Sequence, residues 1–476
     1  MELTAFTELG IILGLAALLG IVFTRLKQPA ILGYILCGLI IGPLTTQYHP
    51  QEEQIELFKD VGITLLLFVL GLELNIKELK NLGSVAFATG IGQIIFTSGV
   101  GYFLSLVLGF GFIDSMYIAI ALTFSSTIII VKLLSTKGQI DSLYGRISVG
   151  FLLVQDFVAI LLIIGLTAMN GVDGASGSGI VLNLGLTALK GVLVGAIVFV
   201  FARFVLNPLL NVIRRDKEIL FITVIAWAVL LAGFMHLPVI GFSIEIGGLL
   251  AGITLSGRFE HLQIESWTRP LRDFFLILFF VVLGLQISVD SISSSLLPAV
   301  LFSLFVLIGN PLIVMIIMGA LGYSSKIGFL TSLAVAQISE FSLILINFAM
   351  DLGHVDATVL TTVTLVGGIT MTVSTYLIYY NEEIYERFSR YLKVFEFSKK
   401  KANETMPVED TIEAVLFGCH RMGRKLLKSV PGAKKHWLVV DIDPQIVAQL
   451  QKEGYKACYG DIGDSELYEA FKISGA

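Results

Sequence analysis

The sequence has few charged residues. Asp, Glu, Lys and Arg make up 14% of its 476 residues, whereas soluble domains average about 25%. Hydrophobic residues make up 55% of the chain, and apolar runs of about 18 residues or more recur along most of its length. Runs of this length and frequency predict a polytopic membrane protein.

Cysteine is also scarce. Three scattered cysteines, Cys37, Cys419 and Cys458, form no CxxC pair, which excludes a disulfide framework and is expected of a chain facing the bacterial cytoplasm. The net charge is only −5, and no block of Lys or Arg indicates nucleic acid as a partner. The six histidines lack metal-ligand spacing, so we predict no metal site. The first apolar run has no small-residue cleavage site and is predicted to be a membrane span.

The apolar runs predict thirteen membrane spans. These are residues 3–24, 30–47, 55–74, 82–108, 113–134, 147–169, 180–206, 218–236, 239–256, 271–288, 295–321, 326–350 and 357–380. Basic residues follow the odd-numbered spans, as Arg25 and Lys27 follow the first, whereas the loops after even-numbered spans contain mostly Asp and His. By the positive-inside rule, the amino terminus lies outside and everything after residue 380 is cytoplasmic.

The composition changes abruptly after the last predicted span. The predicted fold is an all-α membrane domain of inverted repeats (1–380), a cytoplasmic helix with a linker (381–410), and a partial Rossmann-like α/β domain (411–476). AVLFG, HWLVVDID and KACYGD read as buried strands separated by helices. A parallel sheet of only three strands leaves one flank uncovered, so we expect either a truncated chain or a second subunit there.

Polar residues interrupt the fifth and sixth spans. TFSST at residues 123–127 is either Ser/Thr packing between helices or, as five in a row favour, a discontinuous helix lining a polar cavity. Gln155 and Asp156 occur within the sixth span. Because a carboxylate at the centre of a membrane helix costs at least about 2.5 kcal/mol, we predict that Asp156 is the ion or proton site. The alternative, a buried ion pair, has only Lys190 as a nearby base, close to a span end.

Three further spans contain carboxylates. Gln337, Ser339 and Glu340 interrupt the twelfth span and predict a second discontinuous helix that crosses the first at the midplane. Glu340 is either a second proton carrier or an anchor for the freed amides. Glu245 in the ninth span is either functional or structural. Glu73, at the cytoplasmic end of the third span, is expected to cap or orient a neighbouring helix.

The predicted α/β domain contains a glycine-rich fingerprint. G-C-H-R-M-G runs from Gly418 to Gly423 between a predicted strand and a helix, and Asp441 follows about 20 residues later, where an acid can bind ribose hydroxyls. His420 replaces the middle glycine and hinders close approach of a pyrophosphate. The pattern therefore favours a mononucleotide over a dinucleotide, or a fold kept only for assembly.

Together these motifs resemble the monovalent cation:proton antiporter-2 family, and most closely its Kef-type potassium efflux branch. The matching stretches are LGYILCGLIIGP at 32–43, LLFVLGLEL at 66–74, TFSST at 123–127, FLLVQD at 151–156, SIEIGGLLAG at 243–252, LFFVVLGLQI at 278–287 and AQISEF at 336–341. The resemblance implies a dimerisation domain, a mobile core domain and an elevator-like movement. It also implies an ion site formed by Asp156, Gln155, Thr123, Ser125 and Ser126.

One position departs from the family pattern: Asn310 stands where family members usually have a lysine. The missing base puts in doubt any mechanism in which a lysine releases the proton. The α/β domain resembles the nucleotide-binding regulatory domain of Kef and Trk-like systems. That resemblance implies a regulatory nucleotide of the AMP/ATP or NAD(H) type, with no cofactor required for transport itself.

The resemblance implies an antiporter, not an enzyme, that exchanges K⁺ or Na⁺ for protons in the bacterial inner membrane. We expect electroneutral one-for-one exchange through Asp156, with K⁺ favoured, in a homodimer that a cytoplasmic regulatory subunit can join. A ligand-gated potassium channel is the alternative from another class, but it needs a TVGYG-like filter that the sequence lacks. A membrane-anchored oxidoreductase is excluded because half a Rossmann sheet leaves no substrate domain.

Overall fold

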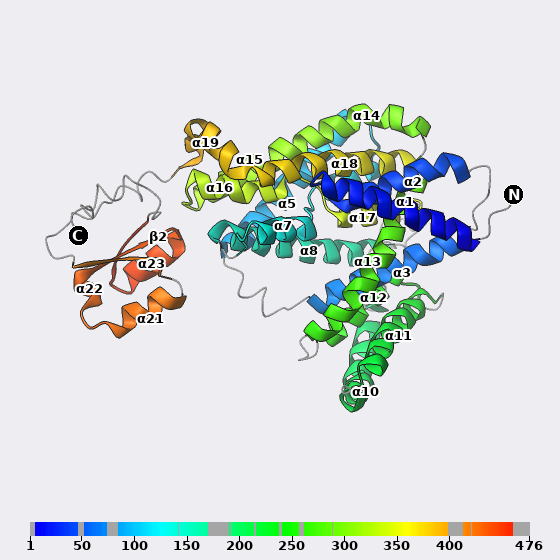
Figure 1. Cartoon of the computed structure of the whole chain (residues 1–476), viewed down its shortest axis with the longest axis horizontal. Coiled ribbons are helices and arrows are strands. Elements are labelled where there is room, and N and C mark those ends of the chain that lie inside the picture. Colours follow the sequence, from blue (N-terminus) through cyan, green and yellow to red (C-terminus); the bar gives the residue numbers. More distant parts are fainter. Residues whose placement is uncertain are drawn as a thin grey trace, which may run out of the picture.

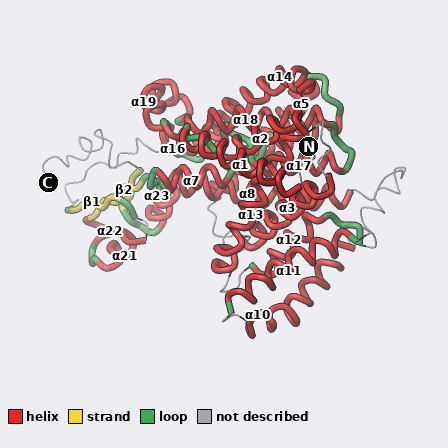
Figure 2. The backbone as a smooth tube through the Cα atoms, turned by 45° about the vertical axis from the view of Figure 1, so that its right-hand side comes forward, coloured by secondary structure: helices red, strands yellow, loops and turns green. Residues whose placement is uncertain are grey.

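The structure is a computed structural model in which a helical body carries a small α/β unit beyond one end (Figures 1 and 2). It describes residues 5–45, 52–73, 84–140, 142–169, 190–191, 193–213, 216–237, 240–256, 261–287, 289–397, 413–419 and 421–459. The first described helix, drawn in deep blue, begins at the end of the body opposite the α/β unit (Figure 1). We call that unit the tail, and we name the two ends of the body tail-proximal and tail-distal.

The described helices of the body form two bundles, because each extensively packed helix pair lies within one of them. The scaffold bundle contains α1 (Ala5–Arg25), α2 (Ala30–Thr45), α3 (Glu52–Glu73), η1 (Ala202–Leu206), α10 (Asn207–Ile213), α11 (Lys217–His236), α12 (Ile244–Leu255) and α13 (His261–Leu285). The core bundle contains α5 (Ser84–Val107), α6 (Phe112–Ala121), α7 (Thr127–Thr136), α8 (Leu143–Met169), α14 (Val289–Leu304), η2 (Phe305–Gly309), α15 (Asn310–Ala320), α16 (Ser325–Ser332), η3 (Leu333–Val335), α17 (Glu340–Asp351) and α18 (Ala357–Tyr379). Side chains of both bundles meet in one buried apolar cluster.

Glycines bring the scaffold helices into backbone contact. A Cβ atom on Gly252 of α12 would lie 2.1 Å from the carbonyl oxygen of Phe68 in α3. One on Gly284 of α13 would lie 2.1 Å from the carbonyl oxygen of Ile35 in α2, beside Gly38. Small residues allow this close approach between membrane helices. The scaffold is therefore held by the fit of one backbone against another.

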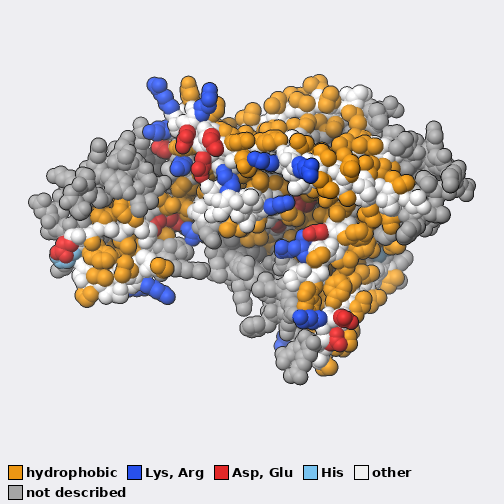
Figure 3. All heavy atoms as spheres, viewed as in Figure 1, with side chains coloured by type: hydrophobic (Ala, Val, Ile, Leu, Met, Phe, Trp, Pro, Cys, Tyr) orange, Lys and Arg blue, Asp and Glu red, His pale blue; other side chains and the backbone are white. Residues whose placement is uncertain are grey.

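Six described segments are long and apolar enough to cross a membrane, by length and composition: Ser84–Val107, Leu193–Ile213, Lys217–His236, Ser291–Ala320, Ser325–Asp351 and Ala357–Tyr379. Shorter apolar helices accompany them, among them α6, α7 and α12. Hydrophobic side chains cover most of the visible face of the helical body (Figure 3), and Phe103 and Leu230 are 68% and 70% exposed. The predicted polytopic helical class is confirmed, although residues 180–189 of the predicted seventh span lie outside the described residues.

Two helices of the core bundle are broken, as predicted. α6 ends at Ala121 and α7 begins at Thr127, while η3 ends at Val335 and α17 begins at Glu340. The Ser342 hydroxyl of α17 donates a hydrogen bond of 2.6 Å to the carbonyl oxygen of Ala121. The two breaks therefore lie side by side inside the core bundle.

A charged amphipathic helix and the tail follow the last helix of the core bundle. α19 (Asn381–Leu392) packs on α16, and residues 398–412 lie outside the described residues. The tail contains β1 (Ala414–Phe417), α21 (Arg421–Ser429), α22 (Ala433–His436), β2 (Trp437–Asp441), α23 (Pro444–Lys452) and β3 (Lys456–Tyr459). Its strands are parallel in the order β1-β2-β3, with Leu416 opposite Val439 and Val439 opposite Ala457. The predicted three-stranded sheet is confirmed.

Candidate functional site

Asp156 and Gln155 lie next to each other on α8, and each contacts the break between α6 and α7. The Thr127 hydroxyl donates to Oδ2 of Asp156 at 2.9 Å, and the backbone N–H of Ser125 donates to Oε1 of Gln155 at 3.1 Å. Asp156 is 6% exposed and Gln155 is fully buried. The broken helix thus presents a hydroxyl to the carboxylate that the sequence predicts as the ion site, and a backbone amide to the neighbouring Gln155.

The hydroxyls of the TFSST segment are used in different ways. Thr123 donates back to the last turn of α6, and Ser126 accepts a hydrogen bond from an amide in the first turn of α7. These two side chains terminate the half-helices. The Ser125 hydroxyl is buried and has no hydrogen-bond partner among the described residues. Ser125 is therefore the hydroxyl available to an ion, while Thr127, to which the sequence assigns no role, contacts Asp156 directly.

The second break contributes Gln337, Ser339 and Glu340. Ser339 caps α17 by accepting the amide of Phe341 at 3.1 Å, and its hydroxyl lies 3.4 Å from Oε2 of Glu340. Glu340 is fully buried in the first turn of α17, where the helix dipole stabilises a carboxylate. Oε1 of Glu340 and Nε2 of Gln337 have no hydrogen-bond partner in the part of the chain that the structure describes.

A run of neutral side chains extends from Gln155 to the second break. Nε2 of Gln155 donates to Oε1 of Gln93 at 2.6 Å, and Nε2 of Gln93 donates to the Thr97 hydroxyl at 3.0 Å. The Thr97 hydroxyl donates to Oδ1 of Asn310 at 2.7 Å. All four side chains are fully buried. We call Gln93, Thr97 and Asn310 the amide brace.

The amide brace ends on the two broken helices. Nδ2 of Asn310 lies 3.4 Å from the carbonyl oxygen of Leu122, at the end of α6, and 3.3 Å from that of Val335, at the end of η3. The sequence singles out Asn310 only as a departure from a family pattern and misses Gln93 and Thr97. Their four-residue spacing on an apolar helix, which places both on one face, is the pattern that could have identified them.

The two remaining predicted carboxylates belong to the scaffold bundle. Glu245 lies in the first turn of α12, within electrostatic range of Asp60 of α3 and Asp351 of α17. It therefore lies on the side of the scaffold that faces the core bundle. Glu73 is the last residue of α3, and its side chain lies outside what the structure describes.

The predicted tail site lies at the carboxyl edge of the small sheet. Gly418 has a φ of +84°, and a Cβ atom on Gly423 would lie 2.1 Å from the carbonyl oxygen of Gly418. Both positions therefore require glycine. Oδ2 of Asp441 accepts the amide of Cys419 at 2.6 Å, and burial, with the carboxylate of Asp441 as a smaller cause, raises the pKa of the Cys419 thiol. The predicted Gly418, Gly423 and Asp441 come together, and His420 lies outside the described residues.

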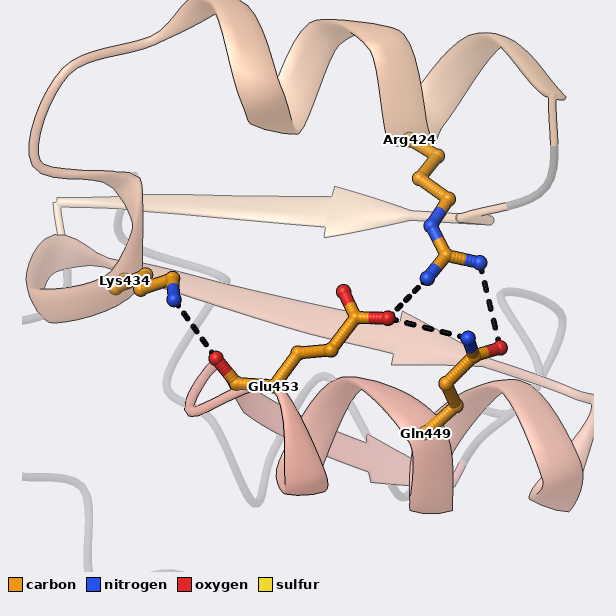
Figure 4. Close-up of polar contacts among 4 residues, drawn as sticks. All are labelled: Arg424, Lys434, Gln449 and Glu453. Carbon is orange, nitrogen blue, oxygen red and sulfur yellow. Dashed lines mark hydrogen bonds and ion pairs between the residues drawn. The ribbon is translucent and has the colours of Figure 1, made fainter.

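Polar contacts tie the helices of the tail to each other (Figure 4). Arg424 of α21 pairs with Glu453 and donates to Oε1 of Gln449 at 3.3 Å. Nε2 of Gln449 donates to Glu453 at 3.1 Å, and Lys434 donates to the carbonyl oxygen of Glu453 at 2.8 Å. These contacts link α21 and α22 to the end of α23. They therefore hold α21, and the glycine turn that precedes it, in place against the sheet.

The same edge of the tail sheet contacts the core bundle. The Tyr323 hydroxyl, between α15 and α16, lies 3.4 Å from Oδ1 of Asp443. Ile442 packs against the apolar cluster that includes residues of α5, α8 and α16. The amide of Asp443 in turn donates to Oδ1 of Asp441 at 2.9 Å. The contact is therefore one hydrogen bond away from the predicted ribose-binding acid.

Two broken helices that meet beside a buried carboxylate define a class, the ion-coupled secondary transporters. The transmembrane model of the sodium/hydrogen exchangers matches residues 13–379, and the chain belongs to this family. A TrkA-N domain matches residues 414–476. The expected antiporter family, with a regulatory domain of the TrkA-N type, is thereby confirmed.

Several curated relatives match over much of the chain. The chain is 29% identical to "K(+) efflux antiporter 5" of Arabidopsis thaliana over 74% of its length and spans only 62% of that relative. It is 25% identical to "Putative cation/proton antiporter YbaL" of Escherichia coli, over 96% of this chain and 82% of that one. It is 28% identical to "Glutathione-regulated potassium-efflux system protein KefC" of Salmonella arizonae, over 97% of this chain and 72% of that one.

A solved structure shares the fold. The sodium proton antiporter MjNhaP1 of Methanocaldococcus jannaschii matches with a TM-score of 0.57 at 17% sequence identity. The match covers 83% of this chain and 99% of MjNhaP1. At this identity the likeness shows the architecture of the membrane domain and nothing of the ion that passes through it.

Proposed function

We propose that this protein exchanges a monovalent cation, K⁺ in preference to Na⁺, for a proton at Asp156. The observation that carries the proposal is the buried carboxylate facing the helix break, with the Thr127 hydroxyl on one oxygen. The same break holds the Ser125 hydroxyl, which has no hydrogen-bond partner among the described residues. An ionised carboxylate in a low-dielectric site needs a compensating positive charge. A proton and a dehydrated cation both supply one, so they compete for Asp156, and competition for one site is the basis of antiport.

The exchange is electroneutral, with one cation for one proton. Asp156 carries one negative charge, and either substrate neutralises it, so both loaded states are neutral. Gln155 and Asn310, which connect the two breaks, are neutral side chains and add no charge to the moving unit. The preference for K⁺ draws on the relatives named as potassium efflux proteins. The separation into a glycine-packed scaffold and a core with the ion site favours an elevator-like movement of the core.

The test uses purified protein in proteoliposomes. Asp156→Asn should abolish cation-dependent proton movement, whereas Asp114→Asn should retain it because Asp114 lies in the first turn of α6, away from the break. An imposed membrane potential alone should drive no uptake in the wild type. Exchange by the Asp156→Asn variant would overturn the site, and uptake driven by voltage alone would overturn the stoichiometry.

We also infer that the tail regulates transport by binding a mononucleotide. Gly418 and Gly423 provide a turn that can approach a phosphate, and Asp441 offers a carboxylate beside it for ribose hydroxyls. The residues present therefore fit a nucleotide of the AMP or ATP type. AMP should raise the thermal unfolding temperature of the full chain more than NAD⁺ does, and Asp441→Asn should remove the difference.

We expect a homodimer with cytoplasmic tails, in which a second subunit covers the open flank of the tail sheet. Protease should then remove the tail from inside-out vesicles and spare it in right-side-out vesicles. Cleavage from the outside would contradict this topology. A monomer by light scattering in detergent would contradict the dimer.

A further inference from the structure

We infer that the amide brace of Gln93, Thr97 and Asn310 positions the cation site, a role that rests on the proposed function. The hydrogen bonds that define the amide brace lead to Gln155, the neighbour of Asp156, and to the helix ends. The three side chains act through Gln155 and through the ends of the two broken helices. The amide brace is thus a set of positioning residues, and it deepens the proposed function by naming what sets the affinity for the cation.

Only one assignment of donors and acceptors fits the hydrogen bonds of the amide brace. At one end the carbonyl oxygens of Leu122 and Val335 only accept, so the NH₂ group of Asn310 must face them and its oxygen must face Thr97. The Thr97 hydroxyl therefore donates to Asn310 and accepts from the NH₂ group of Gln93. That NH₂ group also donates to the carbonyl oxygen of Thr123, which fixes the Gln93 amide independently.

The same assignment of donors and acceptors extends to Gln155 and Ser125 at the ion site. Because the Gln93 oxygen must accept, the NH₂ group of Gln155 faces it, and the Gln155 oxygen is left to accept the backbone N–H of Ser125. The N–H of Ser125 can only donate, so this end agrees with the other. The carbonyls of the helix ends and the amide of Ser125 therefore specify every amide orientation between them. Reversing one member would leave two acceptors or two donors facing each other.

The amide brace satisfies backbone groups that the breaks expose. A helix that stops inside the membrane leaves its last carbonyl groups without donors, and no water is present in the hydrocarbon region to supply them. Asn310 provides donors to the ends of both α6 and η3. A cationic side chain at this position could donate equally well, but it would add a fixed charge to the buried group of side chains that leads to Gln155, the neighbour of Asp156. The neutral amide holds the two helix ends together and leaves Asp156 to be neutralised by its substrates.

The ion site depends on this support. Ser125, whose amide is held by Gln155, carries the unpartnered hydroxyl, and Thr127, two residues later, contacts Asp156. If the amide brace is broken, the segment between α6 and α7 loses its fixed position relative to α8. The distance between the hydroxyls and the carboxylate then changes, which weakens cation binding more than it slows the movement of the core.

The first test compares two threonines of α5. Thr97→Val removes one hydroxyl from the amide brace without changing the size of the side chain, and Thr89→Val is the matched control. Thr89 is equally buried on the same helix, and the contact recorded for its hydroxyl is with the sulfur of Met318 at 3.8 Å. Thr97→Val should raise the KM for the cation about 5- to 30-fold, equivalent to about 1–2 kcal/mol, with a much smaller change in kcat. Thr97→Ser should restore the wild-type KM, and Thr89→Val should match the wild type.

The second test uses pH. In Asn310→Asp, the introduced carboxylate faces the carbonyl oxygens of Leu122 and Val335 and can donate only when it is protonated. The KM of both proteins should rise as the pH is lowered, because protons compete with the cation at Asp156. The ratio of the variant's KM to the wild-type KM should nevertheless fall over the same range. A merely structural defect would leave this ratio independent of pH.

The outcomes separate the two proposals. If the wild type exchanges cations for protons but Thr97→Val and Thr89→Val have the same KM, the amide brace is overturned and the proposed function remains. If the wild type exchanges nothing, the proposed function is wrong, and the role of the amide brace in transport is wrong with it. If Thr97→Val changes kcat alone and Thr97→Ser does not restore it, the three residues hold the fold and do not position the site.

Discussion

An ion pair joins the two bundles at the tail-distal end, and its removal should change transport. Nζ of Lys59 in α3 lies 3.0 Å from Oδ2 of Asp351 at the end of α17. The same oxygen accepts a hydrogen bond of 3.1 Å from Asn347. Because α3 belongs to the scaffold and α17 to the core, any sliding of one bundle past the other must separate this pair.

The size of the effect follows from the exposure of the two groups. The Lys59 side chain is 5% exposed, whereas that of Asp351 is 41% exposed. Breaking a fully buried pair by removing one partner costs about 3–5 kcal/mol, and an exposed pair contributes about 0–1 kcal/mol. With one partner open to solvent, we expect a coupling energy of about 1–2 kcal/mol, which is equivalent to a factor of roughly 5 to 30 in an equilibrium constant.

The assay is a double-mutant cycle with Lys59→Met, Asp351→Asn and the combination, each in detergent and in proteoliposomes. The unfolding free energies should be non-additive by about 1–2 kcal/mol. At saturating cation the double variant should leave the described conformation more readily and exchange faster than the wild type. Lys132→Met, at an exposed lysine of α7, is the control for loss of a surface charge. Additive unfolding energies, or a folded double variant that exchanges more slowly, would refute the reasoning.

Three further predictions concern packing, the tail contact and thiol chemistry. Gly252→Ala should lower the unfolding free energy by about 1–3 kcal/mol through overpacking. Gly233→Ala should leave it unchanged, because the added Cβ atom would meet no atom within 4 Å. Equal stability of the two variants would contradict the close helix contact. Tyr323→Phe and Asp443→Asn should change the exchange rate of the full chain, measured as proton flux, by the same factor. In a chain that ends at residue 397, Tyr323→Phe should leave the exchange rate unchanged. Burial raises the pKa of Cys458 to about 11, so maleimide labelling at pH 7.5 should be roughly 300-fold slower than for a free thiol of pKa about 8.5 and should accelerate toward pH 11.

Much of the fold could be predicted because the membrane imposes simple rules on the sequence. Helices must be long and apolar to span the bilayer, so the runs around α5, α11 and α18 are visible in composition alone. Polar residues within such runs are costly, and that cost identified both breaks and the pair Gln155–Asp156. The tail sheet could be predicted equally well, because short apolar strands alternate with amphipathic helices.

The partners within the site could not be predicted, because a polar residue in a helix does not reveal which other helix it faces. The sequence predicts Thr123 and Ser126 as ligands, and it does not reveal that each hydroxyl also contacts a backbone group of its own half-helix. Thr127 is the first residue of α7, and its hydroxyl contacts Asp156. The contact between Thr97 and Asn310 joins residues 213 positions apart, a pairing that periodicity along one helix cannot reveal.

The distribution of close contacts indicates which surface of the membrane domain can slide. Within the scaffold, backbones interlock at glycines such as Gly252 and Gly284, so relative movement there would force atoms together. Among the described residues, Lys59 pairs with Asp351 across the two bundles at the tail-distal end. At the tail-proximal end Lys27 donates to Tyr379 at 3.0 Å, and Gln28 and Leu26 also form hydrogen bonds with α18. Apolar side chains, which have no directional bonds to break, fill the space between the two ends. The tail contacts the core at Tyr323, so we propose that a ligand that displaces the tail acts first on the bundle that carries Asp156.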